Sequence, residues 1–191
     1  MERILFLGLG YIGLPTAALA ASRGLEVVGV DVDPAIVGKV NRGEIHIVEP
    51  GLAEAVREAV SAGRLRASLE PVPGDVYVVV VPTPFKGNHE PDVSYVEAAT
   101  RSVVPLLKED DLFVIESTSP VGTTDRMARL IFAERPELEG KLSVAYCPER
   151  VLPGNVLYEL VHNDRVIGGI DDRSTRRAME FYARFVEGKL H

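Results

Sequence analysis

Short apolar runs alternate along the chain with longer segments in which apolar residues recur at the period of a helix. Several runs consist almost entirely of Val, Ile or Leu, as at 76–81, and such runs are typical of strands covered on both faces. The pattern predicts strands at residues 4–7, 27–30, 76–81, 112–115, 142–145 and 165–167, and helices at 12–22, 34–41, 52–62, 93–107, 123–133 and 173–186. This order predicts an α/β fold with a doubly wound, mostly parallel sheet and helices on both faces.

Neither a linker nor a repeat interrupts the pattern, so residues 1–191 are expected to form one domain. In a sheet of this kind the ligand lies beyond the carboxyl ends of the strands, where the strand order reverses. Each predicted strand end is therefore a candidate position for a binding or catalytic side chain.

The charge of the chain narrows the partners that it could bind. Its 21 basic and 28 acidic residues give a net charge of −7, and there is no block of Lys or Arg. Nucleic acid and anionic membrane surfaces are therefore poor partners. The first apolar run is too short for a signal peptide and no run reaches the length of a membrane span, so we expect a cytoplasmic protein.

The cysteine and histidine residues of the chain predict neither disulfide bonds nor a metal site. The single cysteine, Cys147, excludes a disulfide framework and a cysteine-based zinc cluster. His46, His89, His162 and His191 are scattered without the spacing of metal ligands, so no metal site is expected.

A glycine-rich turn of the Rossmann dinucleotide-binding type follows the first predicted strand. Its glycines, Gly8, Gly10 and Gly13, have the GxGxxG spacing and open a predicted helix. The first glycine allows the tight turn, the second lets the backbone approach a pyrophosphate, and the third lets helix and strand pack closely. The N–H groups at the start of the helix would then bind the phosphates. A purely structural glycine turn is the alternative.

A carboxylate at the end of the second predicted strand specifies the dinucleotide. Asp31 follows the glycine motif by eighteen residues, where an acidic side chain hydrogen-bonds the ribose hydroxyls of adenosine. It would repel a 2′-phosphate, and Val32 follows it in place of an arginine, so NAD is favoured over NADP. Asp33 is expected to be the N-cap of the next helix, with Pro34 at the first helical position.

Three further strand ends carry polar groups. Two prolines flank Thr83 and hold it where the nicotinamide half of a dinucleotide would pass, although a merely rigid turn is the alternative. Thr118 and Thr124 follow the fourth strand, where hydroxyl residues could equally cap a helix. Glu149 and Arg150 follow the fifth strand as a candidate catalytic acid beside a phosphate- or sugar-binding arginine; as a solvent-facing ion pair they would mean little.

Six segments in this order together resemble the UDP-glucose/GDP-mannose dehydrogenase family: 8–15, 43–50, 81–87, 116–122, 146–154 and 163–169. The resemblance runs along essentially the whole chain. UDP-glucose dehydrogenases carry a second glutamate four residues after the Pro-Glu pair, where this chain has Pro153. The segment 146–154 is therefore similar to the branch of the family that acts on UDP-N-acetylhexosamines.

The resemblance implies oxidation of the C6 alcohol of a UDP-sugar to a carboxylate, with two NAD and one water. It implies that Glu149 and Thr118 act around the catalytic water, and that Arg150 and Val151 bind the UDP-sugar. It places at the cofactor, besides the three glycines, the residues Tyr11, Ile12, Asp31, Thr83 and Thr124. It also places the segment 44–51, with His46 and Glu49, near the cofactor without individual roles.

Oxidation of an aldehyde to an acid needs a nucleophile such as a low-pKa cysteine, with a lysine as base or oxyanion partner. In the family both residues lie beyond the first domain. The chain is therefore expected to be the N-terminal part of a longer dehydrogenase, without the central helix and C-terminal domain, and inactive alone. The resemblance implies a homodimer for the full-length protein, while the fragment could be a monomer. Cys147 is expected to serve packing.

Two other functions remain open at this point. The chain could be a stand-alone regulatory module that senses NAD or a UDP-sugar without catalysis. It could also be a two-electron dehydrogenase of a small hydroxy acid, although the segment 146–154 argues against this.

Overall fold

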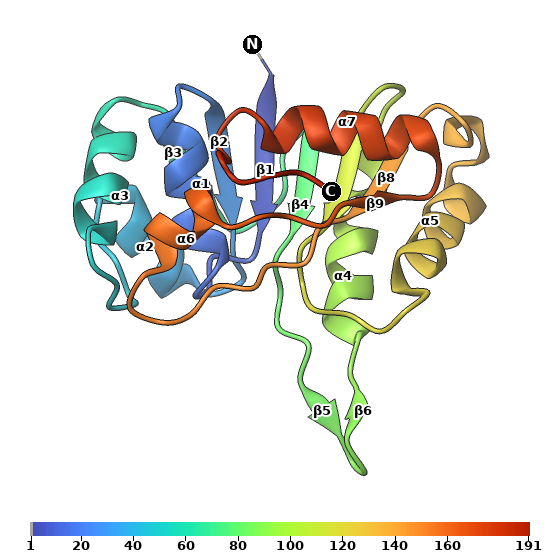
Figure 1. Cartoon of the computed structure of the whole chain (residues 1–191), viewed down its shortest axis with the longest axis horizontal. Helices are drawn as coiled ribbons and strands as arrows, with labels where there is room; N and C mark the ends of the chain where they lie inside the picture. The colour runs from blue at the N-terminus through green and yellow to red at the C-terminus, as the bar shows by residue number, and fades with distance from the viewer. Residues whose placement is uncertain (1) are drawn as a thin grey trace.

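A computed structural model describes residues 2–191 (Figure 1). The strands are β1 Arg3–Leu7, β2 Glu26–Val30, β3 Leu65–Ser68, β4 Val76–Val79, β5 Phe85–Lys86, β6 Glu90–Pro91, β7 Leu112–Ile115, β8 Ser143–Tyr146 and β9 Gly168–Gly169. The α-helices are α1 Gly13–Ser22, α2 Pro34–Asn41, α3 Leu52–Ser61, α4 Ser94–Val103, α5 Thr123–Glu134, α6 Val156–His162 and α7 Asp172–Tyr182, with 3₁₀ turns at Val104–Leu106 and Pro136–Leu138.

Seven strands form the main sheet in the order β3-β2-β1-β4-β7-β8-β9. All neighbouring pairs are parallel except β8 and β9. The chain runs outward from β1 to β3 and then returns to β4 on the other side of β1. The strand order therefore reverses between β1 and β4, which confirms the predicted doubly wound sheet and fixes where a ligand site belongs.

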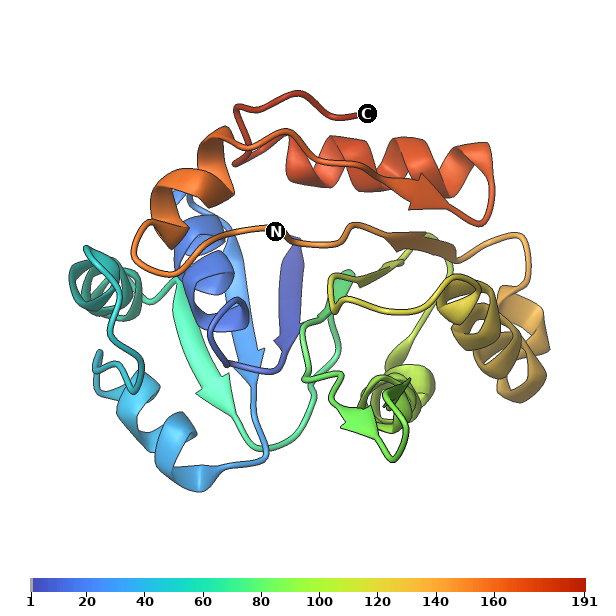
Figure 2. The ribbon, with the colours of Figure 1, turned by 60° about the horizontal axis from the view of Figure 1, so that its bottom comes forward.

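Helices cover both faces of the sheet, and each face has its own apolar core. On one face α1, α3, α6 and α7 pack with residues such as Leu14, Val56 and Phe181. On the other face α4 and α5 pack through Val96, Val103 and Met127. Figure 2 shows α7 on one side of the sheet and α4 on the other. This double covering explains the near-continuous apolar character of the central strands.

Several elements differ from the prediction. β3 and the β5–β6 hairpin were not predicted, and neither was α6. The predicted strand at 165–167 is wrong as part of the sheet: Arg165 and Ile167 donate N–H bonds of 2.8 Å to the carbonyls of Lys189 and His191, and the sheet is entered only at β9. The last helix ends at Tyr182 rather than at 186.

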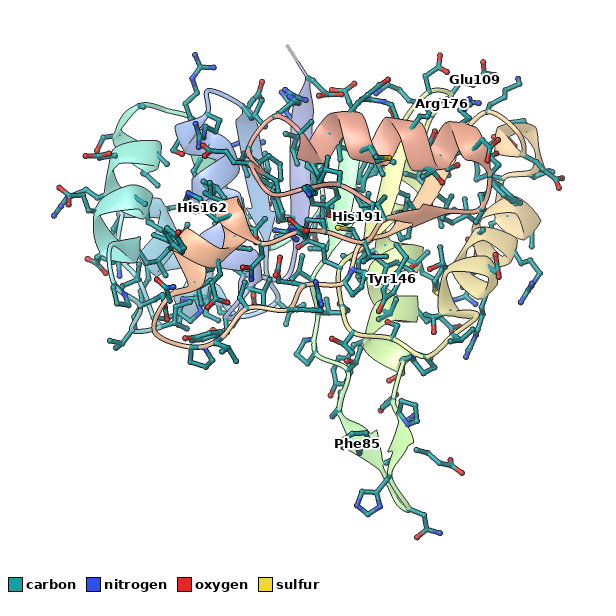
Figure 3. All side chains as sticks on the ribbon, viewed as in Figure 1. Phe85, Glu109, Tyr146, His162, Arg176 and His191 are labelled. Atoms are coloured by element: carbon teal, nitrogen blue, oxygen red, sulfur yellow. The ribbon has the colours of Figure 1, made fainter. Side chains whose placement is uncertain are left out.

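The β5–β6 hairpin extends away from the body of the molecule at the edge toward which the parallel strands point (Figure 1). Phe85 lies on it with 73% of its surface exposed (Figure 3). Within residues 2–191, no helix combines the length and apolar character needed to cross a membrane.

Candidate functional site

One row of the sheet defines the site. Leu7 pairs in register with Val30 on one side and with Val79 on the other, and the row continues through Ile115 to Tyr146. These five residues are the last of their strands, so the residues that follow them emerge side by side. The sequence could not reveal this register, but it is the reason that segments more than a hundred residues apart form one site.

The glycine turn, residues 8–13, begins at the centre of that row. Gly8 has a φ of +105°, and a Cβ on it would lie 2.3 Å from the Val80 carbonyl oxygen. A Cβ on Gly13 would lie 2.0 Å from the Gly8 carbonyl oxygen, so α1 can pack against the turn only without a side chain there. A Cβ on Gly10 would meet nothing within 4 Å. Gly10 thus borders open space, as the approach of a pyrophosphate requires.

Asp31 connects the end of β2 to the glycine turn. One carboxylate oxygen accepts a 2.9 Å hydrogen bond from the Leu9 N–H, and the other accepts one of 3.0 Å from the Asp33 N–H. The carboxylate is therefore held in place while its side chain remains partly open to solvent. Val32 beside it is 92% exposed, and Asp33 caps α2 through the Ala35 N–H, as predicted.

A cavity of about 770 Å³ lies along this row, a volume within the range of roughly 300–1,000 Å³ usual for ligand sites. Much of its lining is apolar, with the side chains of Leu7, Val30, Ile36 and Leu69 among the lining residues. Eight of the predicted site residues also line it: Gly8, Gly10, Tyr11, Ile12, Asp31, Thr83, Thr118 and Glu149. The remaining predicted residues, Gly13, Thr124, Arg150 and Val151, are not among its lining.

Hydrogen bonds tie the loops after β4 and β7 together. The Thr83 hydroxyl donates to the Thr118 carbonyl at 2.7 Å. The Ser117 hydroxyl accepts from the Val81 N–H at 2.9 Å and donates to the Val81 carbonyl at 2.8 Å. Tyr146, labelled in Figure 3, accepts from the Ser119 N–H at 3.2 Å. These bonds hold Thr83 and Thr118 next to each other in the cavity wall.

Neither Thr118 nor Thr124 caps α5. The helix begins at Thr123, its N-cap is Gly122 at a φ of +88°, and no side chain makes a cap hydrogen bond. The capping alternative is therefore wrong for both threonines. Thr118 is exposed at the cavity, whereas Thr124 is half-buried in the first turn of the helix.

Glu149 pairs with an arginine other than the one adjacent in sequence. Its carboxylate forms an ion pair with Arg165, and the two side chains are 6% and 2% exposed. Arg150 is exposed, and its guanidinium donates to the Asp164 carbonyl at 3.3 Å. The alternative of a solvent-facing Glu149–Arg150 ion pair is thus wrong, because the Arg150 contact with Glu149 is a 2.6 Å hydrogen bond donated by its backbone N–H. Val151 packs against the first apolar core.

A second carboxyl faces the same arginine. Glu116, the residue after β7, is buried, lines the cavity and lies 3.8 Å from Arg165. It accepts a 2.7 Å hydrogen bond from the hydroxyl of Tyr182, whose ring lies 5.3 Å from the Arg165 guanidinium carbon. Burial raises the pKa of Glu116 to about 7, against the pull of Arg165 and Tyr182. Burial also raises the pKa of Glu149, again opposed by Arg165.

Two carboxyls therefore share one buried cation. Because burial of a net negative charge is costly, one of the two carboxyls should retain a proton near neutral pH. The arrangement can hold or release a proton beside Thr118. It lies by the ends of β7 and β8, whereas Asp31 follows β2 on the other side of β1 and β4. Sequence reasoning noted the segments that contain Glu116 and Arg165 but gave neither residue a role, and it did not single out Tyr182.

Cys147 is buried next to this cluster. Burial and, to a smaller extent, the neighbouring Glu116 raise the pKa of its thiol to about 12. A thiol in this state is a weak nucleophile, in agreement with the predicted packing role. In the part of the chain that the structure describes, no group of three or more His, Cys, Asp or Glu is arranged to hold a metal ion.

Residues 2–186 match the NAD binding domain of the UDP-glucose/GDP-mannose dehydrogenase family. The chain belongs to this family. The match covers nearly the whole chain and agrees with the glycine turn and Asp31 at the centre of the sheet. The cofactor of the family's domain is NAD, as the sequence predicted.

Named relatives narrow the branch of the family. The chain is 54% identical to "UDP-N-acetyl-D-mannosamine dehydrogenase" of Escherichia coli K12, over 96% of this chain and 46% of that protein. It is 53% identical to "NDP-N-acetyl-D-galactosaminuronic acid dehydrogenase" of Ralstonia nicotianae, over 95% and 45% of the two chains. The solved structure of the UDP-N-acetyl-mannosamine dehydrogenase Cap5O from Staphylococcus aureus superposes with a TM-score of 0.95 at 38% identity, over 99% and 47%. The chain thus spans about half the length of these relatives.

The residues that follow the row at β1 and β2 fit a dinucleotide. Open space borders Gly10, α1 begins at Gly13 without a side-chain cap, and Asp31 presents a fixed carboxylate next to the turn. Such a turn could hold phosphates, and such a carboxylate could accept hydrogen bonds from ribose hydroxyls. Its adenosine half would lie by Asp31, and its nicotinamide half would pass toward Thr83.

Proposed function

We propose that this chain is the NAD-binding part of a dehydrogenase that oxidises the C6 alcohol of a UDP-N-acetylhexosamine, UDP-N-acetyl-D-mannosamine, to the uronic acid. The observation that supports it best is the single row of strand ends. It brings the glycine turn and Asp31 together with Thr118 and Glu149 around one cavity. The choice of sugar rests on the names of the relatives.

Cofactor binding is assigned to the glycine turn and to three residues that follow neighbouring strands. Gly8, Gly10 and Gly13 allow the turn, and the backbone at Tyr11 and Ile12 faces the pyrophosphate. Asp31 accepts from the ribose hydroxyls, and Thr83 with Thr124 borders the nicotinamide half. When bound, NAD supplies the hydride acceptor for the oxidation.

Chemistry is assigned to the opposite end of the cavity. Glu149 and Thr118 orient the water that is added to the carbonyl carbon, and the Arg165 ion pair holds the Glu149 carboxylate in place. Arg150, which is exposed beside Glu149, binds the UDP-sugar together with Val151. Burial raises the pKa of Glu149, which makes its carboxylate a stronger base than that of an exposed glutamate.

The remaining properties of the whole protein are proposals of the same kind. We place it in the cytoplasm, with a UDP-sugar as its partner and without nucleic acid or membrane. We propose one domain for residues 1–191, followed in the full-length enzyme by a central helix and a C-terminal domain that supply the nucleophile and the dimer contacts. The chain alone is expected to bind NAD without turnover.

Calorimetric titration of the chain with NAD and with NADP tests the cofactor site. NAD should bind and NADP should not. Asp31→Ala should weaken NAD binding by about 1–3 kcal/mol, which is roughly 5–150-fold in Kd, because the ribose hydroxyls lose a charged acceptor. Asp33→Ala, which removes the helix cap two residues away, is the matched control and should have much less effect on Kd. Equal losses in both variants would reject the assignment of Asp31.

Counting the NADH formed per molecule of UDP-sugar distinguishes a dehydrogenase from a regulatory module that only binds its ligands. In the full-length protein, UDP-N-acetyl-D-mannosamine should yield two NADH per sugar. One NADH per substrate would indicate a simple two-electron dehydrogenase. Binding of NAD and the UDP-sugar without any NADH would favour a regulatory module.

A further inference from the structure

Glu49 lies in the loop between α2 and α3, and its position is unusual for a loop carboxylate. Only 5% of its surface is exposed. It is not part of the cavity lining, and neither the family resemblance nor the chemistry above gives it a role. Its carboxylate nevertheless bonds to two segments that are far apart in the chain.

The first partner belongs to the glycine turn. The hydroxyl of Tyr11 donates a 2.5 Å hydrogen bond to one oxygen of Glu49. This bond lowers the pKa of Glu49 and raises that of Tyr11, so it joins a carboxylate to a neutral phenol. Tyr11 also lines the cavity. Its backbone therefore lies where the pyrophosphate would approach, while its hydroxyl is fixed to Glu49.

The second partner is the chain just after Glu149 and Arg150. The same Glu49 oxygen accepts a 3.1 Å hydrogen bond from the Gly154 N–H, and the other oxygen accepts one of 2.8 Å from the Val156 N–H. Asn155 is the N-cap of α6 but makes no side-chain cap bond. Glu49, 107 residues earlier in the chain than Val156, thus accepts the N–H bond at the start of α6 that a local side-chain cap would otherwise accept.

We infer that Glu49 is a positioning residue that couples the two halves of the site: NAD at the glycine turn orders the start of α6 and the UDP-sugar segment before it. The inference rests on the proposed function. Its physical basis is that one rigid carboxylate cannot keep all three bonds if Tyr11 moves relative to Gly154. By linkage, a UDP group at the second segment must strengthen NAD binding by the same factor.

Hydrogen exchange of the Gly154 and Val156 amides tests the coupling directly in this chain. Saturating NAD should slow their exchange by roughly 10-fold, within the 5–150-fold range usual for coupled sites. In Tyr11→Phe the NAD-induced slowing should disappear, because the variant loses only the hydroxyl that bonds to Glu49. Tyr95→Phe is the matched control, since Tyr95 lines the same cavity from α4. It should retain the slowing.

Glu49→Gln provides a second, independent variant. Its amide nitrogen cannot accept a bond, so at least one of the Gly154 and Val156 amides should exchange faster even without NAD. Thermal unfolding of each variant would identify a general loss of structure. In the full-length protein, with UDP as the probe, the ratio of NAD Kd values with and without UDP should approach one in both variants.

The outcomes separate this inference from the proposed function. If calorimetry shows that NAD does not bind the unmodified chain, the proposed function fails, and the coupling fails with it. If NAD binds but does not alter exchange at Gly154 and Val156, the function stands and the coupling is wrong. The same holds if Tyr11→Phe keeps the full NAD-induced slowing.

Discussion

Replacing Glu116 with glutamine removes one of the two carboxyls that face Arg165 at the buried end of the cavity. The amide has the shape of the carboxyl, and its oxygen can still accept from the Tyr182 hydroxyl. What changes is titration: glutamine stays neutral at every pH. The variant therefore isolates the proton that the buried cluster holds.

The size of the effect on the free energy of unfolding follows from the pKa of Glu116. Burial raises it from the ordinary value of 4.5 to about 7. Below pH 4.5 both the folded and the unfolded chain carry this proton, so its contribution to stability is fully present. As the pH rises through about 7, the folded state loses the proton in turn, and the contribution disappears. The shift corresponds to about 3 kcal/mol, with a maximal slope of about 1.4 kcal/mol per pH unit.

Urea unfolding at several pH values between 5 and 8 measures this slope. The unmodified chain should lose about 3 kcal/mol more than Glu116→Gln over the titration range, to order of magnitude. Groups that lie away from the cluster of Glu116, Glu149 and Arg165 are the same in both proteins and cancel in the difference. Glu109→Gln is the control and should leave the slope unchanged, because Glu109 is exposed and lies near Arg176 of α7, away from the cluster (Figure 3). Equal slopes in Glu116→Gln and the unmodified chain would refute the shared-proton reasoning.

Two further predictions concern the glycine turn and the cysteine. Gly13→Ala should destabilise the fold by about 1–3 kcal/mol or more, since its Cβ would lie 2.0 Å from the Gly8 carbonyl oxygen. Gly10→Ala meets nothing within 4 Å, so it should keep the unfolding midpoint while weakening NAD binding; a loss of midpoint equal to that of Gly13→Ala would contradict this. Cys147, buried with a thiol pKa of about 12, should resist iodoacetamide at pH 8 until urea unfolds the chain, and rapid alkylation of the folded protein, followed by mass spectrometry, would show the thiol to be accessible.

The central strands could be predicted because their burial leaves little freedom in composition. The run at 76–81 is almost all valine, and β4 occupies its first four residues between β1 and β7. The glycine turn was predictable for a similar reason, since no side chain fits at Gly8 or Gly13. In both cases a steric requirement restricts residues that are neighbours in sequence, and the pattern therefore records it.

β3 and α6 show what local sequence does not record. β3 is an edge-side strand of four residues, and it includes an exposed Arg66, so it has no continuous apolar run. α6 has only seven residues, and its first N–H group bonds to Glu49 rather than to a residue nearby. Asn155 is of a type common at N-caps, but its side chain makes no cap bond and the helix after it is too short to show a helical period.

The partner of Glu149 illustrates the same limit at the site itself. Glu149 and Arg150 are adjacent in sequence, yet the Glu149 side chain is buried and Arg150 is exposed to solvent. Arg165 reaches Glu149 because the C-terminal residues 189–191 pair with its backbone and hold it beside the sheet. Patterning therefore locates the strand ends, and eight of the residues predicted there line the cavity. It cannot predict that Glu149 pairs with Arg165, because this ion pair depends on how two separate loops pack against the sheet.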